Sequence, residues 1–305
     1  MSSLDGKVAV ITGAAHGLGR GHALYLAQQG ARIVVNDLGA DVTGSGADES
    51  AAQQVVDEIR EAGGEAVAHY GDAADFGAAE GMVRSAVENF GSLDILILNA
   101  GFTRDSIIYN MSEQDFDDVV RVHLKGHFAG MKFASQYWRE KAKREGGPVY
   151  GRIIGTASES AIFMEPGQPN YGPAKAGIIN LTMGTAKLLH KYGVTANVVM
   201  PRARTRMTLQ GQGGAMFQKP EEGFDHFDPA NSTPLFAYLC GPEAERITAQ
   251  LFIVWGKQVM VMARMQRGAN FESDDPWTLA SLHEELGPHF EKQEPIADGF
   301  PVIPG

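Results

Sequence analysis

Cysteine is almost missing from this sequence: Cys240 is the only one among 305 residues. A single thiol cannot form a disulfide within the chain, and cysteine-based metal sites need more than one thiolate. The histidines form no cluster with acidic residues at the spacing of metal ligands. We therefore expect no bound metal and a reducing, cytoplasmic setting.

Long apolar runs and basic charge are scarce as well. No stretch reaches the roughly 18 consecutive apolar residues of a membrane-spanning helix, and the N-terminal segment has no apolar signal region. Lysine and arginine total 26 against 37 aspartate and glutamate, a formal net charge of −11. Because phosphate backbones and anionic lipids bind basic surfaces, this balance argues against nucleic-acid and membrane partners. A small-molecule substrate is expected.

What is present is a regular alternation of short apolar runs with amphipathic stretches, in a chain that is 44% hydrophobic. Such alternation predicts an α/β fold with a doubly wound parallel sheet. Ligands bind at the carboxyl ends of the strands of such sheets. The expected strands are residues 7–11, 31–36, 66–70, 93–98, 151–155, 195–200 and 251–255.

Four segments outside these strands carry specific expectations. A single long helix is predicted over residues 112–142, and another over residues 171–191. Residues 208–230 show no periodicity and should form a loop that acts as a substrate lid. A short helix is expected over residues 277–286.

A glycine-rich turn follows the first strand. Gly13, Gly17 and Gly19 stand between that strand and a helical pattern, where free amides and the helix dipole favour a pyrophosphate. Asp37 ends the second strand, and a carboxylate there accepts hydrogen bonds from adenosine ribose hydroxyls and repels a 2′-phosphate. Asp72, after the third strand, is placed to receive the adenine amino group. The pattern favours NAD over NADP; the alternative for Asp37 is that it only caps the following turn.

Tyr171 and Lys175 are four residues apart and so share one face of an expected helix. Because proline is tolerated only in the first turn, Pro173 places Tyr171 at the helix N-terminus. An ammonium beside a phenol lowers the phenol pKa, which would make Tyr171 a usable acid or base. Ser158 adds a hydroxyl that could polarise a substrate oxygen. Taken alone, the spacing also fits a solvated lysine and a tyrosine at the edge of the core.

In order and spacing, these motifs resemble the short-chain dehydrogenase/reductase family over about residues 5–260. The resemblance rests on the glycine turn, on Asn99-Ala100-Gly101, on Ser158 and on the Tyr171/Lys175 pair. It implies a single Rossmann-type domain at residues 1–260 and a C-terminal extension at residues 261–305, packed on that domain or on a partner subunit. It also implies a homodimer or homotetramer.

The resemblance assigns roles to these residues. Tyr171 would be the general acid/base, Lys175 would lower its pKa and hold the nicotinamide ribose, and Ser158 would orient the substrate oxygen. His123 stands where most members carry an asparagine that anchors a proton-relay water, and a histidine could hold the same water. The cofactor-binding residues implied are Gly13, His16, Gly17, Leu18, Gly19, Asp37, Asp72, Ala73, Asn99, Ala100, Gly101, Tyr171, Lys175, Pro201 and Thr205.

One branch of the family is especially similar. Val35–Gly39, Arg121–Leu124 and Gln168–Tyr171 resemble the (3R)-hydroxyacyl-CoA dehydrogenase domain of peroxisomal multifunctional enzyme type 2, also called 17β-hydroxysteroid dehydrogenase type 4, and its stand-alone actinobacterial relatives. This resemblance implies NAD-dependent oxidation of a secondary alcohol, most simply a 3-hydroxyacyl-CoA. Arg202, where most members have glycine, would offer cations for CoA phosphates together with Arg204 and Arg206; the alternative is a solvated basic loop.

Other functions remain open at this stage. A steroid or terpene alcohol dehydrogenase would use the same residues with an apolar cavity. A 3-oxoacyl-[acyl-carrier-protein] reductase is disfavoured because the net charge of −11 would repel an acidic carrier protein. A non-catalytic dinucleotide-binding regulator is a hypothesis of another class, and the intact Ser158, Tyr171 and Lys175 argue against it.

Overall fold

The computed structural model describes residues 4–41, 43–46, 48–163, 165–210, 214–263 and 267–292. The chain divides into two compact units, Met1–Met262 and Ala263–Gly305. Within the second unit, the expected short helix is present as α10 (Leu279–Phe290), which begins two residues later than predicted and is capped by Thr278 and Ser281. How the extension packs remains a prediction. In the part of the chain described, no helix is long and apolar enough to cross a membrane.

An eight-stranded sheet forms the first unit, in the order β3-β2-β1-β4-β5-β6-β7-β8. The first seven strands pair in parallel, and each ends within a few residues of its predicted limit. The order reverses at β1 and β4, so the doubly wound prediction is confirmed. The strands are β1 (Val8–Thr12), β2 (Arg32–Asp37), β3 (Ala66–Tyr70), β4 (Ile95–Leu98), β5 (Gly151–Thr156), β6 (Val194–Pro201), β7 (Leu251–Trp255) and β8 (Gln258–Val261).

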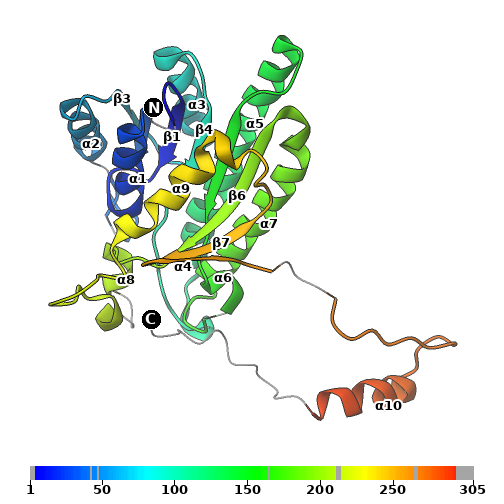
Figure 1. Cartoon of the computed structure of the whole chain (residues 1–305). Helices are drawn as coiled ribbons and strands as arrows, with labels where there is room; N and C mark the ends of the chain where they lie inside the picture. Colours follow the sequence, from blue (N-terminus) through cyan, green and yellow to red (C-terminus); the bar gives the residue numbers. More distant parts are fainter. Residues whose placement is uncertain are drawn as a thin grey trace. The chain divides into compact units, whose positions relative to one another are not determined.

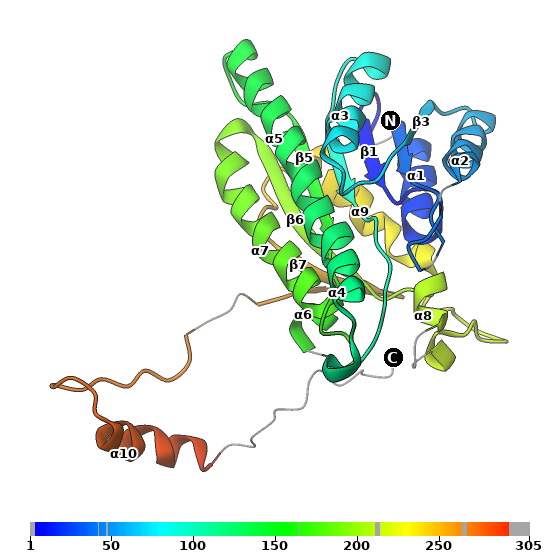
Figure 2. The same ribbon diagram turned by 180° about the vertical axis from the view of Figure 1, so that it is seen from behind.

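Helices cover both faces of the sheet, as parallel strands require. Figure 1 shows α1 (Gly17–Gln28), α2 (Glu49–Glu61) and α9 (Thr233–Cys240) on one face. Figure 2, from behind, shows α3 (Phe76–Phe90), α5 (Gly126–Glu145) and α7 (Tyr171–Leu189) on the other. This arrangement leaves the carboxyl ends of the strands free to form a binding site.

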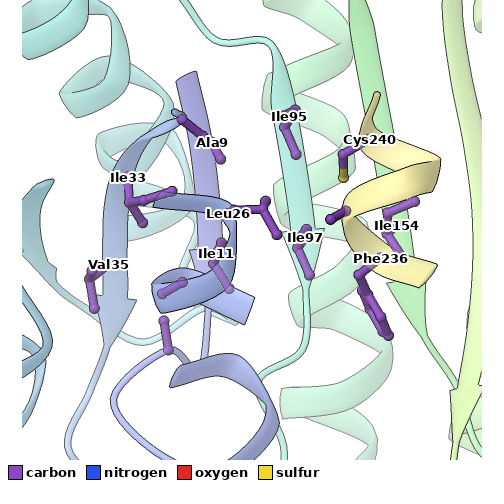
Figure 3. Packing of buried hydrophobic residues seen from close by; sticks show 14 of the residues in the cluster. Ala9, Ile11, Leu26, Ile33, Val35, Ile95, Ile97, Ile154, Phe236 and Cys240 are labelled. Carbon is purple, nitrogen blue, oxygen red and sulfur yellow. The ribbon is translucent and has the colours of Figure 1, made fainter. Parts of the chain in front are cut away.

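The core explains why these segments become strands. Every residue of β1 and β4 is buried, and alternate side chains point to opposite faces. Figure 3 shows one of the two layers, in which Ile11 and Ile97 pack against Leu26 of α1 and Phe236 of α9. The sole cysteine, Cys240, is buried in this layer as an apolar side chain.

The edge of the sheet differs from the prediction, which ended the sheet at β7. Strand β8 follows Gly256, which has a positive φ of 52°, and pairs antiparallel with β7. Val259 and Val261 of β8 are 53% and 63% exposed. The sequence does not predict β8, because it has only four residues and its apolar side chains are solvated and do not belong to a core.

The long helix predicted over residues 112–142 is interrupted. It consists of α4 (Glu113–Val120), a π-helical segment (Arg121–Lys125) and α5, which continues to Glu145. A π segment widens one turn of a helix and is frequent at functional sites. Here it contains His123, whose side chain is almost completely buried.

The predicted loop at residues 208–230 also contains helical turns. Helix α8 (Arg206–Gln210) and two short 3₁₀ segments at Gly214–Phe217 and Pro229–Asn231 occupy part of it. Residues 211–213 lie outside the described part. The described loop residues are fixed partly by Asn231, whose side-chain amide donates to the carbonyl oxygen of Asp225 at 2.8 Å.

Buried His22 should make the first unit sensitive to acid. It stacks on Phe236 at 3.9 Å, neither ring nitrogen has a partner among the described residues, and burial lowers its pKa from 6.5 to about 3. Below pH 6.5 the histidine is protonated in the unfolded chain but stays neutral in the folded chain. The free energy of unfolding therefore decreases as the pH is lowered. On going from pH 7.5 to pH 5, His22 alone should lower the free energy of unfolding by about 2 kcal/mol.

The measurement is urea unfolding of the wild type and of His22→Leu at both pH values. We expect the variant to lose about 2 kcal/mol less than the wild type on acidification. Equal losses in the two proteins would show that His22 does not carry the effect.

Candidate active site

The glycine turn after β1 is closely packed and tolerates few side chains. Gly13 and Gly17 have positive φ values of 64° and 52°. A Cβ at Gly19 would lie 2.1 Å from the carbonyl oxygen of Gly13, and one at Gly13 would lie 2.7 Å from Cα of Ala100. His16 is the N-cap residue of α1 and leaves the first helical amides without a side-chain cap. The turn therefore presents bare backbone at a helix N-terminus, which suits an anion.

The turn is tied to the end of β4. The hydroxyl of Thr12 accepts from the backbone amides of Asn99 at 3.0 Å and Ala100 at 3.1 Å. In return, the Asn99 side-chain amide donates to the carbonyl oxygen of Gly13 at 3.2 Å. These bonds join the segments that follow β1 and β4, the two neighbouring strands at which the strand order reverses. The two segments together form one wall of a cleft.

We call this cleft the glycine-turn cleft; it opens at the carboxyl ends of β1 to β4. Eleven residues predicted to bind a cofactor line it: Gly13, His16, Gly17, Leu18, Asp37, Asp72, Ala73, Asn99, Ala100, Gly101 and Thr205. Gly19 is not among the lining residues; it packs against Gly13 and Asn99, which are. The sequence did not point to other lining residues, among them Leu38, Gly44 and Phe102, which carry no motif of their own; Arg121 and Arg206 also line the cleft, although they were singled out for other reasons.

Asp37 both shapes the turn and faces the glycine-turn cleft. One carboxylate oxygen accepts from the backbone amide of Ala15 at 2.8 Å, and the other accepts from Gly39 at 2.7 Å. The capping role that the sequence left as an alternative is therefore present. A carboxylate can accept about four hydrogen bonds, so capacity remains for two hydroxyl groups.

Asp72 is engaged within the protein. Its carboxylate accepts from the backbone amide of Ala74 at 2.8 Å and forms an ion pair with Arg121 at 2.6 Å. Both partners of the ion pair line the glycine-turn cleft. Each oxygen of Asp72 has one partner, so acceptor capacity remains, and its role toward an adenine amino group stays a prediction.

A second hollow, which we call the Ser158 cavity, is lined by Ser158, Tyr171 and Pro201. Its apolar wall includes Ile107, Met207, Met216 and Phe217. Met207 also lines the glycine-turn cleft, so the two hollows share α8 as a common wall. Of the predicted cofactor-binding residues, Tyr171 and Pro201 thus face the Ser158 cavity.

Tyr171 is the first residue of α7, as predicted. The fully buried Asn170 fixes it there: its side-chain oxygen accepts from the Tyr171 amide at 2.7 Å. The amide nitrogen of Asn170 donates to the carbonyl oxygens of Arg104 at 3.0 Å and Asp115 at 3.1 Å. Ser158 and Tyr171 line the same cavity, so the structure brings the two predicted hydroxyl groups together.

Lys175 lies one turn further along α7 and is 3% exposed. Its ammonium nitrogen donates to the carbonyl oxygen of Thr156 at 2.7 Å and lies 5.3 Å from the centre of the Tyr171 ring. It is not part of the lining of either hollow. The lysine therefore lies beside the Tyr171 ring on the inner side of α7, away from both hollows.

The expected lowering of the tyrosine pKa is wrong for the protein without bound ligands. Burial raises the pKa of Tyr171 to about 12, and the smaller effect of the Ser158 hydroxyl lowers it. Burial also lowers the pKa of Lys175 from 10.5 to about 7, because the ammonium is desolvated. Burial therefore disfavours the charged form of both side chains.

His123 lies against Tyr171, with ring centres 5.0 Å apart and planes at 89°. Its Nε2 is 2.7 Å from the carbonyl oxygen of Phe102 and 3.2 Å from the Phe102 amide nitrogen. The shorter contact places the proton on Nε2. Burial and then Lys175 lower the pKa of His123 well below 6.5, so the ring is neutral. Nδ1 is then a buried acceptor with no partner among the described residues.

The arginines expected to bind CoA phosphates are mostly engaged. Arg202 forms a two-pronged ion pair with Glu159, and its guanidinium lies 4.2 Å from the Trp255 ring. Arg204 forms the same kind of pair with Asp225. Both guanidinium groups are therefore engaged within the protein, and a role of this loop in binding CoA phosphates stays a prediction. Arg206 is exposed and lies at the edge of the glycine-turn cleft.

The arrangement as a whole defines the class of protein. The family model described as short chain dehydrogenase matches residues 7–210, and the chain belongs to this family of oxidoreductases. Members of this family use nicotinamide dinucleotide cofactors.

Particular relatives are similar over most of the chain. Hydroxyacyl-CoA dehydrogenase ChsB1 of Mycobacterium tuberculosis is 42% identical over 96% of this chain and 92% of its own length. Peroxisomal multifunctional enzyme type 2 of Drosophila melanogaster is 44% identical over 79% of this chain, which spans 38% of that larger protein. A short chain dehydrogenase from Mycobacterium avium has a TM-score of 0.85, with 42% identity, over 98% of this chain and 100% of that structure.

Proposed function

We propose that this chain is an NAD-dependent dehydrogenase that oxidises the secondary alcohol of a 3-hydroxyacyl-CoA to a ketone. The observation that carries the proposal is the pair of hydroxyl groups of Ser158 and Tyr171 on the wall of a partly apolar cavity, next to the glycine-turn cleft. The names of the relatives ChsB1 and multifunctional enzyme type 2 support the substrate class.

The residues of the glycine-turn cleft fit a dinucleotide. The turn leaves no room for a Cβ at Gly13 or Gly19, as expected where backbone must approach a pyrophosphate. The remaining acceptor capacity of Asp37 fits the two hydroxyls of an adenosine ribose. Bound NAD would supply the acceptor for the hydride that leaves the carbinol carbon.

Tyr171 would take the hydroxyl proton of the substrate as the carbon–hydrogen bond breaks. Ser158 would donate a hydrogen bond to the same oxygen and hold it against the phenol. Because the Tyr171 pKa is about 12 in the protein alone, the phenolate must gain stabilisation from charges and donors that arrive with the ligands. Lys175, with a pKa of about 7, is then placed to take up or release a proton near neutral pH.

His123 would serve this proton transfer through a water molecule. Its unpartnered Nδ1 is buried beside the Tyr171 ring, and a neutral imidazole nitrogen accepts a hydrogen bond from water. Buried polar atoms of this kind are commonly satisfied by internal water. The histidine would thus perform the anchoring role that the family usually assigns to asparagine.

Cofactor choice depends on Asp37. Replacing it by alanine removes the negative charge that would repel a 2′-phosphate, so the ratio of kcat/KM for NAD to that for NADP should fall about tenfold or more. Asp37→Asn is the matched variant, because it removes the charge but keeps an acceptor for the turn amides. Steady-state kinetics with both cofactors measures the ratio. An unchanged preference for NAD in both variants would remove Asp37 from the proposal.

The substrate class is tested by following NAD reduction with a panel of alcohols. We expect the highest kcat/KM for 3-hydroxyacyl-CoA thioesters, lower values for steroid and terpene alcohols, and the lowest for acyl-carrier-protein thioesters. A steroid alcohol as the best substrate would contradict the proposal. No turnover with any member would favour the non-catalytic alternative.

A further inference from the structure

The wall of the Ser158 cavity is rich in negative charge. Three carboxylates line it, namely Asp105, Glu159 and Glu165, and the single basic residue among the described lining residues is Arg202. Arg202 is paired with Glu159 through both of its carboxylate oxygens. Asp105 and Glu165 therefore give the cavity a negative charge that Arg202 does not balance.

Asp105 is held in place by a precise set of contacts. The side-chain amide of Gln168 donates to both carboxylate oxygens, at 3.2 Å and 3.1 Å. The next residue, Ser106, donates its backbone amide to the carbonyl oxygen of Gly167 at 2.9 Å, which ties the two segments together. Gln168 neutralises none of the charge, because an amide is uncharged. The carboxylate is thus fixed in the cavity wall with acceptor capacity to spare.

The charge of Asp105 reaches the reacting groups. It raises the pKa of Tyr171 by electrostatic repulsion of the phenolate, so the carboxylate and the phenol interact across the cavity. Burial raises the pKa of Asp105 itself, since the cavity wall withdraws part of its hydration. An anion bound beside Tyr171 would therefore meet a negative charge that Gln168 holds in place, on a side chain that solvent also reaches.

We infer that Asp105 is a specificity-determining residue, which excludes free 3-hydroxy acids and admits their thioesters. The inference rests on the proposed function and deepens it. In a free 3-hydroxy acid the carboxylate stands two carbons from the carbinol, so it must enter the cavity together with the reacting carbon. In the thioester that carbonyl is uncharged, and the spare acceptor capacity of Asp105 can take a hydrogen bond from a donor on the thiol portion. Repulsion between Asp105 and the substrate carboxylate thus discriminates between the free acid and its thioester, which carry the same secondary alcohol.

The test compares 3-hydroxybutyrate with the N-acetylcysteamine thioester of 3-hydroxybutyrate, which carries no phosphates. We expect Asp105→Asn to raise kcat/KM for the free acid about tenfold and to change that for the thioester less than about threefold, as loss of one nearby like charge predicts. Asp105→Glu keeps the charge and should keep the wild-type discrimination. Asp105→Ser provides a second neutral variant, smaller than Asn, if the Asn variant is unstable.

A merely structural role for Asp105 would lower both activities together and leave their ratio unchanged. Glu88→Gln is the control for removing a carboxylate elsewhere, since Glu88 pairs with Arg84 on the exposed face of α3; it should change neither activity. An unchanged ratio in the neutral variants of an active enzyme overturns the role of Asp105 and leaves the proposed function standing. Failure of the wild type to oxidise the CoA thioester of 3-hydroxybutyrate overturns the proposed function and this assignment with it.

Discussion

Replacing Tyr171 by phenylalanine should lower kcat by roughly 10²–10⁴-fold, the usual contribution of a positioned general acid/base. Phenylalanine keeps the ring that packs with Phe102 and Val119, so the fold and the position of α7 should be retained. What is lost is the hydroxyl that faces Ser158 in the cavity. Single-turnover measurements of NADH formation, with NAD and substrate saturating, report the effect on the chemical step.

Tyr238→Phe is the matched control. Tyr238 lies on α9, is 49% exposed and is absent from the lining of either hollow, so its variant should keep the wild-type rate. Dinucleotide affinity should also survive in Tyr171→Phe, because this side chain faces the Ser158 cavity. If Tyr171→Phe retained more than about a tenth of the wild-type rate, the mechanism proposed for Tyr171 would be wrong.

Gly19→Ala should lower the affinity for the dinucleotide by about 10²-fold or more. The added Cβ would lie 2.1 Å from the carbonyl oxygen of Gly13 and 2.8 Å from the side-chain nitrogen of Asn99. Neither atom can move freely, because the Gly13 oxygen accepts from Asn99 and Asn99 is tied to Thr12. The turn and α1 must separate, and a displacement of about 1 Å typically costs 10²-fold in a precisely built site. Overpacking should also destabilise the fold by about 1–3 kcal/mol.

Gly184→Ala is the control for adding a methyl group to a helical glycine. A Cβ at Gly184, in α7, would have no atom within 4 Å, so alanine should stabilise the protein by up to about 1 kcal/mol. Its dinucleotide affinity should equal that of the wild type. Calorimetric titration with NAD and thermal unfolding separate the two effects, and tight NAD binding by Gly19→Ala would refute the packing argument.

The strands of the sheet could be predicted because each is a continuous run of buried apolar residues, for example the four residues of β4. Strand β8 could not, since its side chains are largely solvated and its partner is identified only by the turn at Gly256. The π segment at Arg121–Lys125 was missed for another reason. One additional residue in a helical turn leaves the apolar pattern nearly unchanged, so the sequence still indicates one long helix.

At the site, the sequence indicated which residues would meet but not how they would be charged. Ser158 and Tyr171 come together as expected, because strand, turn and helix follow in fixed order. The pKa of Tyr171 depends on burial by segments far away in the chain, which no local spacing reports. The same holds for Arg202 and Arg204: their partners Glu159 and Asp225 lie 43 and 21 residues away in sequence.

The contact between Gly101 and His123 also restricts how this sequence can change. A Cβ at Gly101 would lie 2.0 Å from Cε1 of His123, so the imidazole fills the space that any other residue at 101 would need. The two positions are therefore not independent during evolution. While histidine stands at 123, glycine is obligatory at 101, and a lineage can leave glycine only after the ring at 123 has first been replaced by something smaller. A substitution at 101 is therefore tolerated only if the substitution at 123 comes first.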